Sequence, residues 1–218
     1  MRVCVLIPCY NEELTIKETI DDFKKYIPIE DIIVCDNNST DNTLRTALKC
    51  GARVITEKKQ GKGFAMQTLF NYAKFRQYDI YIMVDGDNTY LASNVNELIS
   101  KINGGYDMVV GQRDVYFEET KKLANVLGNK LLMFLLRKYK EEISDPLSGY
   151  RAFSKDFIEK YPCNVDGFDI EMDMNIWAIK NKMKMTSVIV PFQNRPEGSY
   201  SKINLKDGIK ILCRLIKN

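Results

Sequence analysis

The spacing of apolar positions changes in a regular way along the first half of the chain. Short apolar runs, typical of strands buried on both faces, occupy residues 2–8, 31–35, 53–56, 80–84 and 107–110. Segments with helical spacing lie between or after them, at residues 12–26, 41–50, 63–76 and 93–103. This alternation predicts right-handed β-α-β units, and therefore an α/β fold with a mostly parallel central sheet flanked by helices.

The second half of the chain has a less regular pattern. Segments rich in apolar residues predict helices over residues 120–140, 170–181 and 205–216, with a strand over 186–191. Residues 145–149 and 195–202 contain Pro and Gly and predict loops. The sequence contains no repeat, low-complexity stretch or clear linker, so we expect residues 1–218 to form a single domain.

Polar residues follow four of the predicted strands. These segments are Pro8–Glu12, Asp36–Ser39, Asp85–Asp87 and Gln112–Arg113. Ligands of parallel α/β sheets bind beyond the carboxyl ends of the strands, so the four segments predict a site at one edge of the sheet.

Asp85, Gly86 and Asp87 form a candidate metal site. Two carboxylates separated by one residue can converge on one divalent cation if the backbone turns at the glycine. An exposed turn is the alternative, but the buried run at residues 80–84 directly before the pair favours a position at the edge of the sheet.

Other polar groups are candidates that also have ordinary explanations. Asp36, next to a strand end, is a candidate ligand for a base or ribose, whereas Ser39 and Asp41 fit helix capping. Lys62, between two glycines at the start of a helix, offers a cation and free amides to a phosphate.

The remaining candidates lie in the second half of the chain. Arg113, Arg195 and Lys202 are in predicted loops, where a solvated surface charge is the usual explanation of a cation. Glu171 lies between Asp169 and Asp173 at the start of a helix, where acidic residues favour the helix dipole.

Composition limits the chemistry that the chain can perform. None of its 218 residues is histidine, which excludes Ser-His-Asp and Cys-His triads, the HExxH zinc site and any histidine base. The 45% apolar and 28% charged residues are typical of a globular protein with a core. A net charge of +3 predicts no bulk attraction to nucleic acid. Catalysis therefore has to use carboxylates, Lys, Arg, Tyr, Cys or a metal held by oxygen.

Cysteine placement and hydropathy predict a cytoplasmic protein with reduced thiols. Cys4, Cys9 and Cys35 lie in or beside apolar runs, as buried free thiols do, and no CxxC pair occurs. The longest apolar run, residues 131–136, is far shorter than the roughly 18 residues of a membrane span. The first residues enter a strand pattern without the apolar region of a signal peptide.

Nine motifs, taken in order, resemble those of family 2 glycosyltransferases with the GT-A nucleotide-sugar fold. Within that family they resemble the polyprenyl-phosphate hexose synthases, which include dolichol-phosphate mannose synthase. The motifs are IPCYNEE (Ile7–Glu13), VCDNNSTDNT (Val34–Thr43), GKGFA (Gly61–Ala65), VDGDNTY (Val84–Tyr90), GQR (Gly111–Arg113), LGNKLL (Leu127–Leu132), SDPLSGYRAF (Ser144–Phe153), GFDIEM (Gly167–Met172) and RPEGSYSK (Arg195–Lys202). Many family 2 enzymes share the first four, and the combination of the later motifs is narrower.

The resemblance implies a role for most of the candidates. The base and ribose pocket of a UDP- or GDP-hexose would be lined by Pro8, Tyr10, Glu12, Val34 and Asp36. Mg²⁺ or Mn²⁺ would be held across the diphosphate by Asp85 and Asp87. The diphosphate and an acceptor phosphate would be bound by Arg113, Arg195 and Lys202. Residues 1–112 would then form the nucleotide-sugar-binding half and residues 113–218 the acceptor-binding half.

The acceptor decides whether a base is needed. A polyprenyl phosphate is already anionic at neutral pH, so it can displace the nucleoside diphosphate directly, with inversion. A saccharide hydroxyl, as in cell-surface polysaccharide synthesis, needs a carboxylate base, for which Glu171 and Asp169 are candidates. A third alternative is a non-catalytic module that binds a nucleotide sugar without turnover.

Two features depart from the relatives. Dolichol-phosphate mannose synthases often have Gln two positions after the second metal carboxylate, where this chain has Thr89, so the metal ligands or the sugar preference are expected to differ. Many relatives also have C-terminal transmembrane helices, which this sequence lacks. We hypothesise peripheral contact with the inner face of the membrane through the basic, leucine-rich helix at residues 123–139 and the helix at 205–216. Packing of both helices on the sheet is the alternative.

Overall fold

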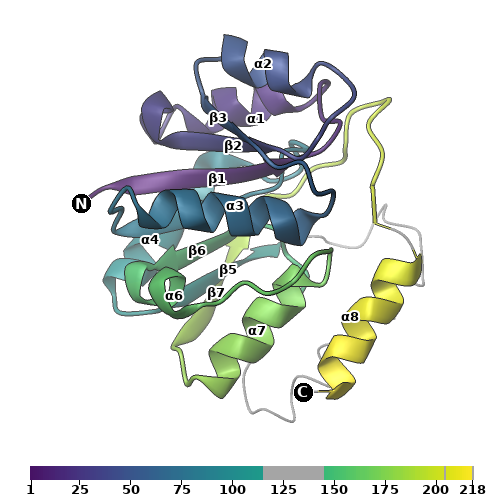
Figure 1. The fold of residues 1–218 in the computed structure, drawn as a ribbon. Coiled ribbons are helices and arrows are strands. Elements are labelled where there is room, and N and C mark those ends of the chain that lie inside the picture. Colours follow the sequence, from purple (N-terminus) through teal and green to yellow (C-terminus); the bar gives the residue numbers. More distant parts are fainter. Residues whose placement is uncertain (115–144, 204, 218) are drawn as a thin grey trace.

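Seven strands form one mixed sheet within the residues that the computed structural model describes, which are 1–114, 145–203 and 205–217 (Figure 1). The strands are β1 (Val3–Cys9), β2 (Ile32–Asp36), β3 (Arg53–Thr56), β4 (Ile80–Met83), β5 (Met108–Arg113), β6 (Arg151–Ser154) and β7 (Met185–Val190). Their order in space is β3-β2-β1-β4-β6-β5-β7. β6 runs antiparallel to β4 and β5, and the other neighbouring pairs are parallel. The predicted mostly parallel sheet is therefore confirmed.

Helices cover both faces of the sheet. One face carries α1 (Ile16–Phe23), α2 (Thr43–Lys49) and α4 (Val95–Asn103), and the other carries α3 (Lys62–Lys74), α6 (Lys155–Lys160) and α7 (Ile170–Lys180). Two short 3₁₀ turns, η1 (Ile29–Asp31) and η2 (Ala92–Asn94), precede β2 and α4. The last helix, α8 (Leu205–Lys217), stands beside α7 in Figure 1.

The period of two along the strands divides the core into two apolar clusters. In β1, Val5 and Ile7 pack with α1 and α4, whereas Cys4 and Leu6 pack with α3. Both sets are fully buried, which is why the strand has no polar positions. The expected free thiols Cys4, Cys9 and Cys35 are confirmed, because all three are unpaired and buried.

The strand order explains where the site lies. From β1 the chain builds outward to β2 and β3, and it then returns to place β4 on the opposite side of β1. The loops after β1 and β4 therefore leave in different directions, and such a switch point is where α/β sheets bind ligands. The segment between β7 and α8 crosses the same edge of the sheet in Figure 1.

Several predicted boundaries differ from the structure. β6 and α6, over residues 151–160, were not predicted from the pattern. The strand predicted over residues 107–110 continues to Arg113, because β7 pairs with it along its whole length. The predicted helix at 12–26 narrows to α1, and residues 12–15 form a turn before it. The long helix predicted over 120–140 lies outside the described residues.

No helix in the described part of the chain is both long enough and apolar enough to cross a membrane.

The start of α3 packs tightly against the segment that leads to α7. A Cβ atom built on Gly63 would lie 2.1 Å from the carbonyl oxygen of Val165, and one on Gly61 would lie 2.0 Å from that of Asp166. Backbone cannot yield to such a contact as a flexible side chain can. Both positions therefore require glycine for close packing between α3 and residues 165–166.

We expect Gly63→Ala to destabilise the protein by about 1–3 kcal/mol, because the added methyl overpacks this contact. Ala is otherwise favoured over Gly in helices by about 1 kcal/mol. Gly208→Ala in α8 is the matched control, since no atom lies within 4 Å of a Cβ built there, and it should be neutral or stabilising. Urea unfolding of both variants measures the difference. Equal stability of Gly63→Ala and wild type would contradict the close contact.

Candidate active site

The Asp85–Asp87 turn follows β4 at the switch point. Its glycine faces the end of β1, and a Cβ atom built on Gly86 would lie 2.4 Å from the Sγ of Cys9. Thr15, before α1, donates a hydrogen bond of 2.9 Å to the Gly86 carbonyl. The close approach of β1 and this bond hold the turn, so the two aspartates are presented at the edge of the sheet.

Asp87 is held by donors from its own turn and from the 195–202 loop. Its Oδ1 accepts hydrogen bonds from the Thr89 amide at 3.1 Å and the Thr89 hydroxyl at 2.6 Å. Its Oδ2 forms an ion pair with Arg195 Nη2. Thr89, the residue at which the sequence departs from the relatives, therefore orients the second carboxylate of the turn.

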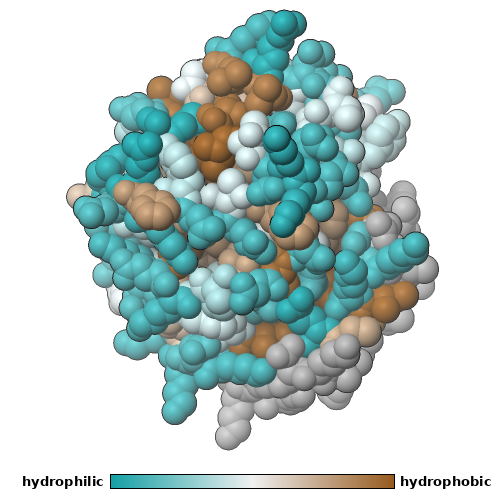
Figure 2. All heavy atoms as spheres, in the orientation of Figure 1, coloured by the Kyte–Doolittle hydropathy of each residue, from teal (hydrophilic) through white to brown (hydrophobic). Residues whose placement is uncertain are grey.

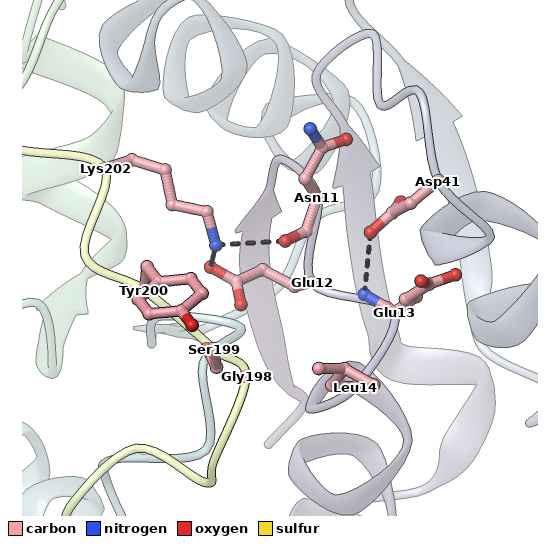
Figure 3. Close-up of a pocket in the computed structure, with 9 residues that line it drawn as sticks. All are labelled: Asn11, Glu12, Glu13, Leu14, Asp41, Gly198, Ser199, Tyr200 and Lys202. Atoms are coloured by element: carbon pink, nitrogen blue, oxygen red, sulfur yellow. Dashed lines mark hydrogen bonds and ion pairs between the residues drawn. The ribbon is translucent and has the colours of Figure 1, made fainter.

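Glu12 is the second carboxylate that receives cations from the same loop. Lys202 Nζ lies 2.5 Å from Glu12 Oε1 and also donates to the Asn11 carbonyl at 3.0 Å, as Figure 3 shows. Arg195 Nη1 lies 3.6 Å from Glu12 Oε1. The backbone amide of Glu12 donates to Thr43 at 2.7 Å, which fixes the turn before α1. An ion pair thus connects Glu12 with Lys202, which lies 190 positions away in sequence.

Burial makes both carboxylates depend on these cations. Burial raises the pKa of Glu12, and the nearby Lys202 only partly offsets this rise. Burial also raises the pKa of Asp87, the charge of Asp85 adds to it, and Arg195 opposes it. Opposite charges attract more strongly in a buried site, where the effective dielectric is low, so Asp87 and Glu12 together form a surface that favours cations.

Asp85, the first carboxylate of the turn, belongs to a separate ion-pair cluster. Lys62 Nζ lies 2.6 Å from Asp85 Oδ1 and 2.5 Å from Glu171 Oε1, so it bridges the turn and α7. Burial alone lowers the pKa of Lys62, but the charges of Asp85 and Glu171 outweigh it and raise the pKa above its ordinary value. Lys62 is therefore a permanent cation that neutralises part of both carboxylates.

The glycines on either side of Lys62 pack against neighbouring segments of the protein. The Gly61 amide donates to Asn37 Oδ1 at 2.8 Å, and the glycines on either side of Lys62 face the carbonyls of residues 165–166. The sequence suggested that this segment offers free amides to a phosphate. Close packing is a second reason for the two glycines, and phosphate binding by this segment stays a prediction.

Arg113, at the end of β5, forms a bidentate ion pair with Asp145. Its Nε and Nη2 each lie 2.6 Å from an Asp145 carboxylate oxygen, and its guanidinium stacks 5.4 Å from the centre of the Phe192 ring. Burial alone lowers the pKa of Arg113, but the Asp145 bonds reverse this and raise it. Asp145 was not singled out from the sequence, although it lies in a family motif.

The 145–149 loop also contacts the metal-site turn. A Cβ atom built on Gly149 would lie 2.1 Å from Asp85 Oδ2, so Gly149 packs directly behind this carboxylate and a larger residue would displace it. The Gly149 amide donates to the Tyr90 hydroxyl at 3.1 Å. The loop therefore forms one wall of the site, and this role was missed because a lone glycine in a loop motif has no distinctive sequence signal.

The candidates for nucleoside binding lie at the ends of β1 and β2. Cys9 and Asp36 are paired across these strands, and Tyr10 follows β1 in a half-buried position. The Oδ1 of buried Asp36 has no hydrogen-bond partner among the described residues. Pro8 is a buried strand residue, and the Val34 side chain is fully buried in the core rather than at the edge of the sheet.

A cleft of about 250 Å³ opens beside the Glu12–Lys202 ion pair (Figure 3). Its lining comes from the turn before α1, from the loop before α2 and from the 195–202 loop: Asn11, Glu12, Glu13, Leu14, Asp41, Gly198, Ser199, Tyr200 and Lys202. The sequence explained Asp41 by helix capping, and its carboxylate does accept the amide of Thr43 at 2.9 Å. The cleft shows that loops from both halves of the chain enclose a common space.

The donor set fits a divalent cation that is bound together with a ligand. Asp85 and Asp87 supply hard carboxylate oxygens, which suit Mg²⁺ or Mn²⁺. No cluster of three or more acidic, cysteine or histidine side chains suited to a metal occurs among the described residues. The protein thus offers two carboxylates, and a bound diphosphate or water would have to complete the coordination.

We expect Lys62→Met to destabilise the protein by about 3–5 kcal/mol, because it leaves the buried Glu171 and the half-buried Asp85 without their shared cation. Lys17→Met is the control, since the exposed Lys17–Asp21 pair should contribute less than about 1 kcal/mol. Chemical denaturation measures both. A loss for Lys62→Met no larger than for the control would mean that the bridge does not hold the site.

Comparison with known proteins identifies the family. The model of glycosyl transferase family 2 matches residues 4–162. The chain is 31% identical over 221 residues to glycosyltransferase AglJ of Haloferax volcanii. This alignment covers 99% of the present chain and 71% of AglJ. It is 31% identical over 197 residues to a dolichyl-phosphate hexose transferase of the same organism, covering 88% and 83% of the two chains.

Solved structures have the same fold. Glucosyl-3-phosphoglycerate synthase of Mycobacterium tuberculosis, in complex with Mg²⁺ and uridine diphosphate, superimposes with a TM-score of 0.80 at 22% identity. The match covers 99% of this chain and 78% of that one. The GT-A fold expected from the sequence is therefore confirmed. With the family model covering most of the sequence, the chain belongs to glycosyl transferase family 2 and is a glycosyltransferase.

Proposed function

We propose that the protein transfers a hexose from a UDP- or GDP-hexose to a polyprenyl phosphate, with inversion and with a divalent metal. The observation that carries this proposal is the convergence of carboxylates and cations at one edge of the sheet. Arg195 joins Asp87 to Glu12 there, and Lys62 joins Asp85 to Glu171. The similarity to a dolichyl-phosphate hexose transferase supports the acceptor class.

The donor would lie across the ends of β1, β2 and β4. The unpartnered Asp36 carboxylate oxygen is suited to accept a hydrogen bond from the base or ribose, with Tyr10 and the backbone near Pro8 beside it. Asp85 and Asp87 would hold Mg²⁺ or Mn²⁺, which neutralises the charge that develops on the departing diphosphate. Residues 1–112 would thus supply most donor contacts.

The cations of the second half would bind phosphate groups. Arg195 and Lys202 are the loop cations at the carboxylate surface, and Arg113 lies at the end of β5 with its orientation set by Asp145. Arginine suits this role because its guanidinium can grip two phosphate oxygens at once. Residues 113–218 would thus bind the acceptor phosphate and share the diphosphate.

The state of the candidate bases favours a phosphate acceptor over a saccharide hydroxyl. A hydroxyl must lose a proton, and Glu171 and Asp169 are the candidates to accept it. Glu171 is only 3% exposed and bound to Lys62, and Asp169 is 4% exposed and paired with Arg214. Both carboxylates are thus buried and already engaged by cations, which leaves them little access to an incoming hydroxyl. A phosphate oxyanion needs no base at all.

The decisive experiment offers labelled UDP- and GDP-hexoses with a polyprenyl phosphate. We expect a lipid product whose sugar is released by mild acid, as a phosphodiester is, and its loss with EDTA. Asp87→Asn should lower the rate at least about a hundredfold, because a metal supplies several kcal/mol of charge stabilisation. Asp21→Asn, on the exposed side of α1, is the control.

An acid-stable glycoside product would instead support the saccharide acceptor. Full activity of Asp87→Asn, or activity unaffected by EDTA, would remove the metal role. No transfer to either acceptor with any donor would overturn the proposal.

Contact with a membrane is a further part of the proposed function. α8 buries Ile211 against Met172 and Ile176 but leaves Ile209 54% exposed, between the exposed Lys206 and Lys210. Apolar and polar surface lie side by side in this region in Figure 2. An exposed isoleucine flanked by lysines suits an anionic lipid surface. The other helix predicted for this contact, at 123–139, lies outside the described residues.

We expect the protein to float with vesicles containing phosphatidylglycerol and less with pure phosphatidylcholine. Ile209→Asp should weaken binding about tenfold or more, because burying an isoleucine is worth ~1.5–3 kcal/mol. Leu48→Asp is the matched control, since Leu48 is 55% exposed on α2, at the opposite end of the molecule from α8 (Figure 1). Absence of the wild type from the lipid fraction would contradict membrane contact.

A further inference from the structure

A fully buried arginine lies beneath the loop that supports the site. Arg151 is the first residue of β6, has no exposed surface and points toward α7. Its Nε donates to the Ser148 carbonyl at 2.9 Å, its Nη2 to the Pro146 carbonyl at 2.8 Å and its Nη1 to Asn175 Oδ1 at 2.6 Å. One guanidinium thus spans two carbonyls of the 145–149 loop and a side chain of α7.

Asn175, in α7, also holds the 145–149 loop. It is fully buried, and its Nδ2 donates to the Pro146 carbonyl at 2.9 Å, the same oxygen that receives Arg151 Nη2. Ser148 ties the loop to β5 through a 2.6 Å hydrogen bond to the Gly111 carbonyl. Hydrogen bonds from Arg151, Asn175 and Ser148 therefore hold the loop on the side that faces away from the site.

The same loop contacts two groups of the proposed reaction from above. Asp145 holds the guanidinium of Arg113 with two bonds of 2.6 Å, and Gly149 lies directly behind the Asp85 carboxylate. A small displacement of the loop would move a metal carboxylate and a phosphate-binding cation together. Only three residues lie between Asp145 and Gly149 along this loop, so a rigid anchor beneath it serves both contacts.

The charge of Arg151 also belongs to the balance of the site. None of the described carboxylates lies within ion-pair distance of it, yet burial lowers its pKa while the charges of Glu171 and Asp145 raise it. A neutral side chain could fill the same space at lower desolvation cost. The three acceptors around Arg151 explain a guanidinium here, because a planar, multidentate donor spans them at once and a lysine or an apolar residue does not.

We propose that Arg151 is a positioning residue for hexosyl transfer, which fixes the 145–149 loop so that Gly149 supports Asp85 and Asp145 orients Arg113. The inference rests on the proposed function, because it assigns Arg151 to the site that binds metal and diphosphate. Arg151 itself touches neither the metal carboxylates nor the cleft. Its effect passes through the loop, as residues behind metal ligands act elsewhere.

The test compares Arg151→Lys with wild type in binding and in turnover. Lysine keeps the charge but cannot span the three acceptors. We expect the affinity for Mn²⁺ with UDP or GDP, followed by titration calorimetry, to fall about tenfold to a hundredfold. The donor KM and the metal concentration for half-maximal rate should rise by a similar factor.

Tyr78→Phe is the control for general destabilisation. It removes a buried hydrogen bond of 2.9 Å to Asp31 at the opposite end of the strands from the site. It should lower Tm without changing nucleotide or metal affinity. If Arg151→Lys does not fold, Asn175→Ala replaces it, since this change removes one acceptor of the guanidinium and one donor to Pro146, and a smaller loss in the same direction is expected.

Three outcomes separate the inference from the proposed function. Weaker metal-nucleotide binding in the Arg151 or Asn175 variant but not in Tyr78→Phe supports the inference. Unchanged binding and rate in these variants, or equal losses in Tyr78→Phe, overturns it while leaving the proposed function intact. Failure of wild type to bind Mn²⁺ with either nucleotide overturns both.

Discussion

The pairing of buried carboxylates with cations from distant segments is the interaction on which the site depends. Glu12, Asp87 and Glu171 are each less than 9% exposed, and an unpaired charge at such burial costs several kcal/mol. Each is paired: two by the 195–202 loop and one by the first residue of α3. Charge compensation therefore decides where these segments lie, because the apolar core holds the sheet but not its edge.

This arrangement has a consequence for ligand binding. A diphosphate and a divalent cation bring opposite charges into the site together, so Arg195 and Asp87 can exchange partners without leaving a buried charge alone. The ion pairs that stabilise the protein are thus also suited to the proposed substrates. Thr89 keeps Asp87 oriented through such an exchange, since its two hydrogen bonds engage the oxygen that Arg195 does not contact.

The sequence predicted the sheet and the edge at which the site lies because both follow from local patterns. Apolar runs mark buried strands, and Asp36 and Asp85 come at or after strand ends. β6 was not predicted, because its four residues, RAFS, are too few to show the alternation of a strand. Its antiparallel pairing depends on β4 and β5, which are distant in sequence. Asp145 was not predicted as a site residue, because its role is the ion pair with Arg113, which lies 32 residues away in sequence. Lys62 was singled out for phosphate, but its carboxylate partners come from two other elements and could not be inferred from spacing.

The choice of acceptor cannot come from the fold, since enzymes with the same sheet at 22% identity share the architecture alone. It depends instead on whether a carboxylate near the transferred sugar is available to accept a proton. Lys62 stays charged because Asp85 and Glu171 raise its pKa, and its ammonium engages the buried Glu171 carboxylate in an ion pair. A chain without histidine has few other bases to offer, and a substrate that arrives already ionised requires none. The ion pairs beneath the site therefore favour a phosphate acceptor, and the absence of histidine is consistent with it.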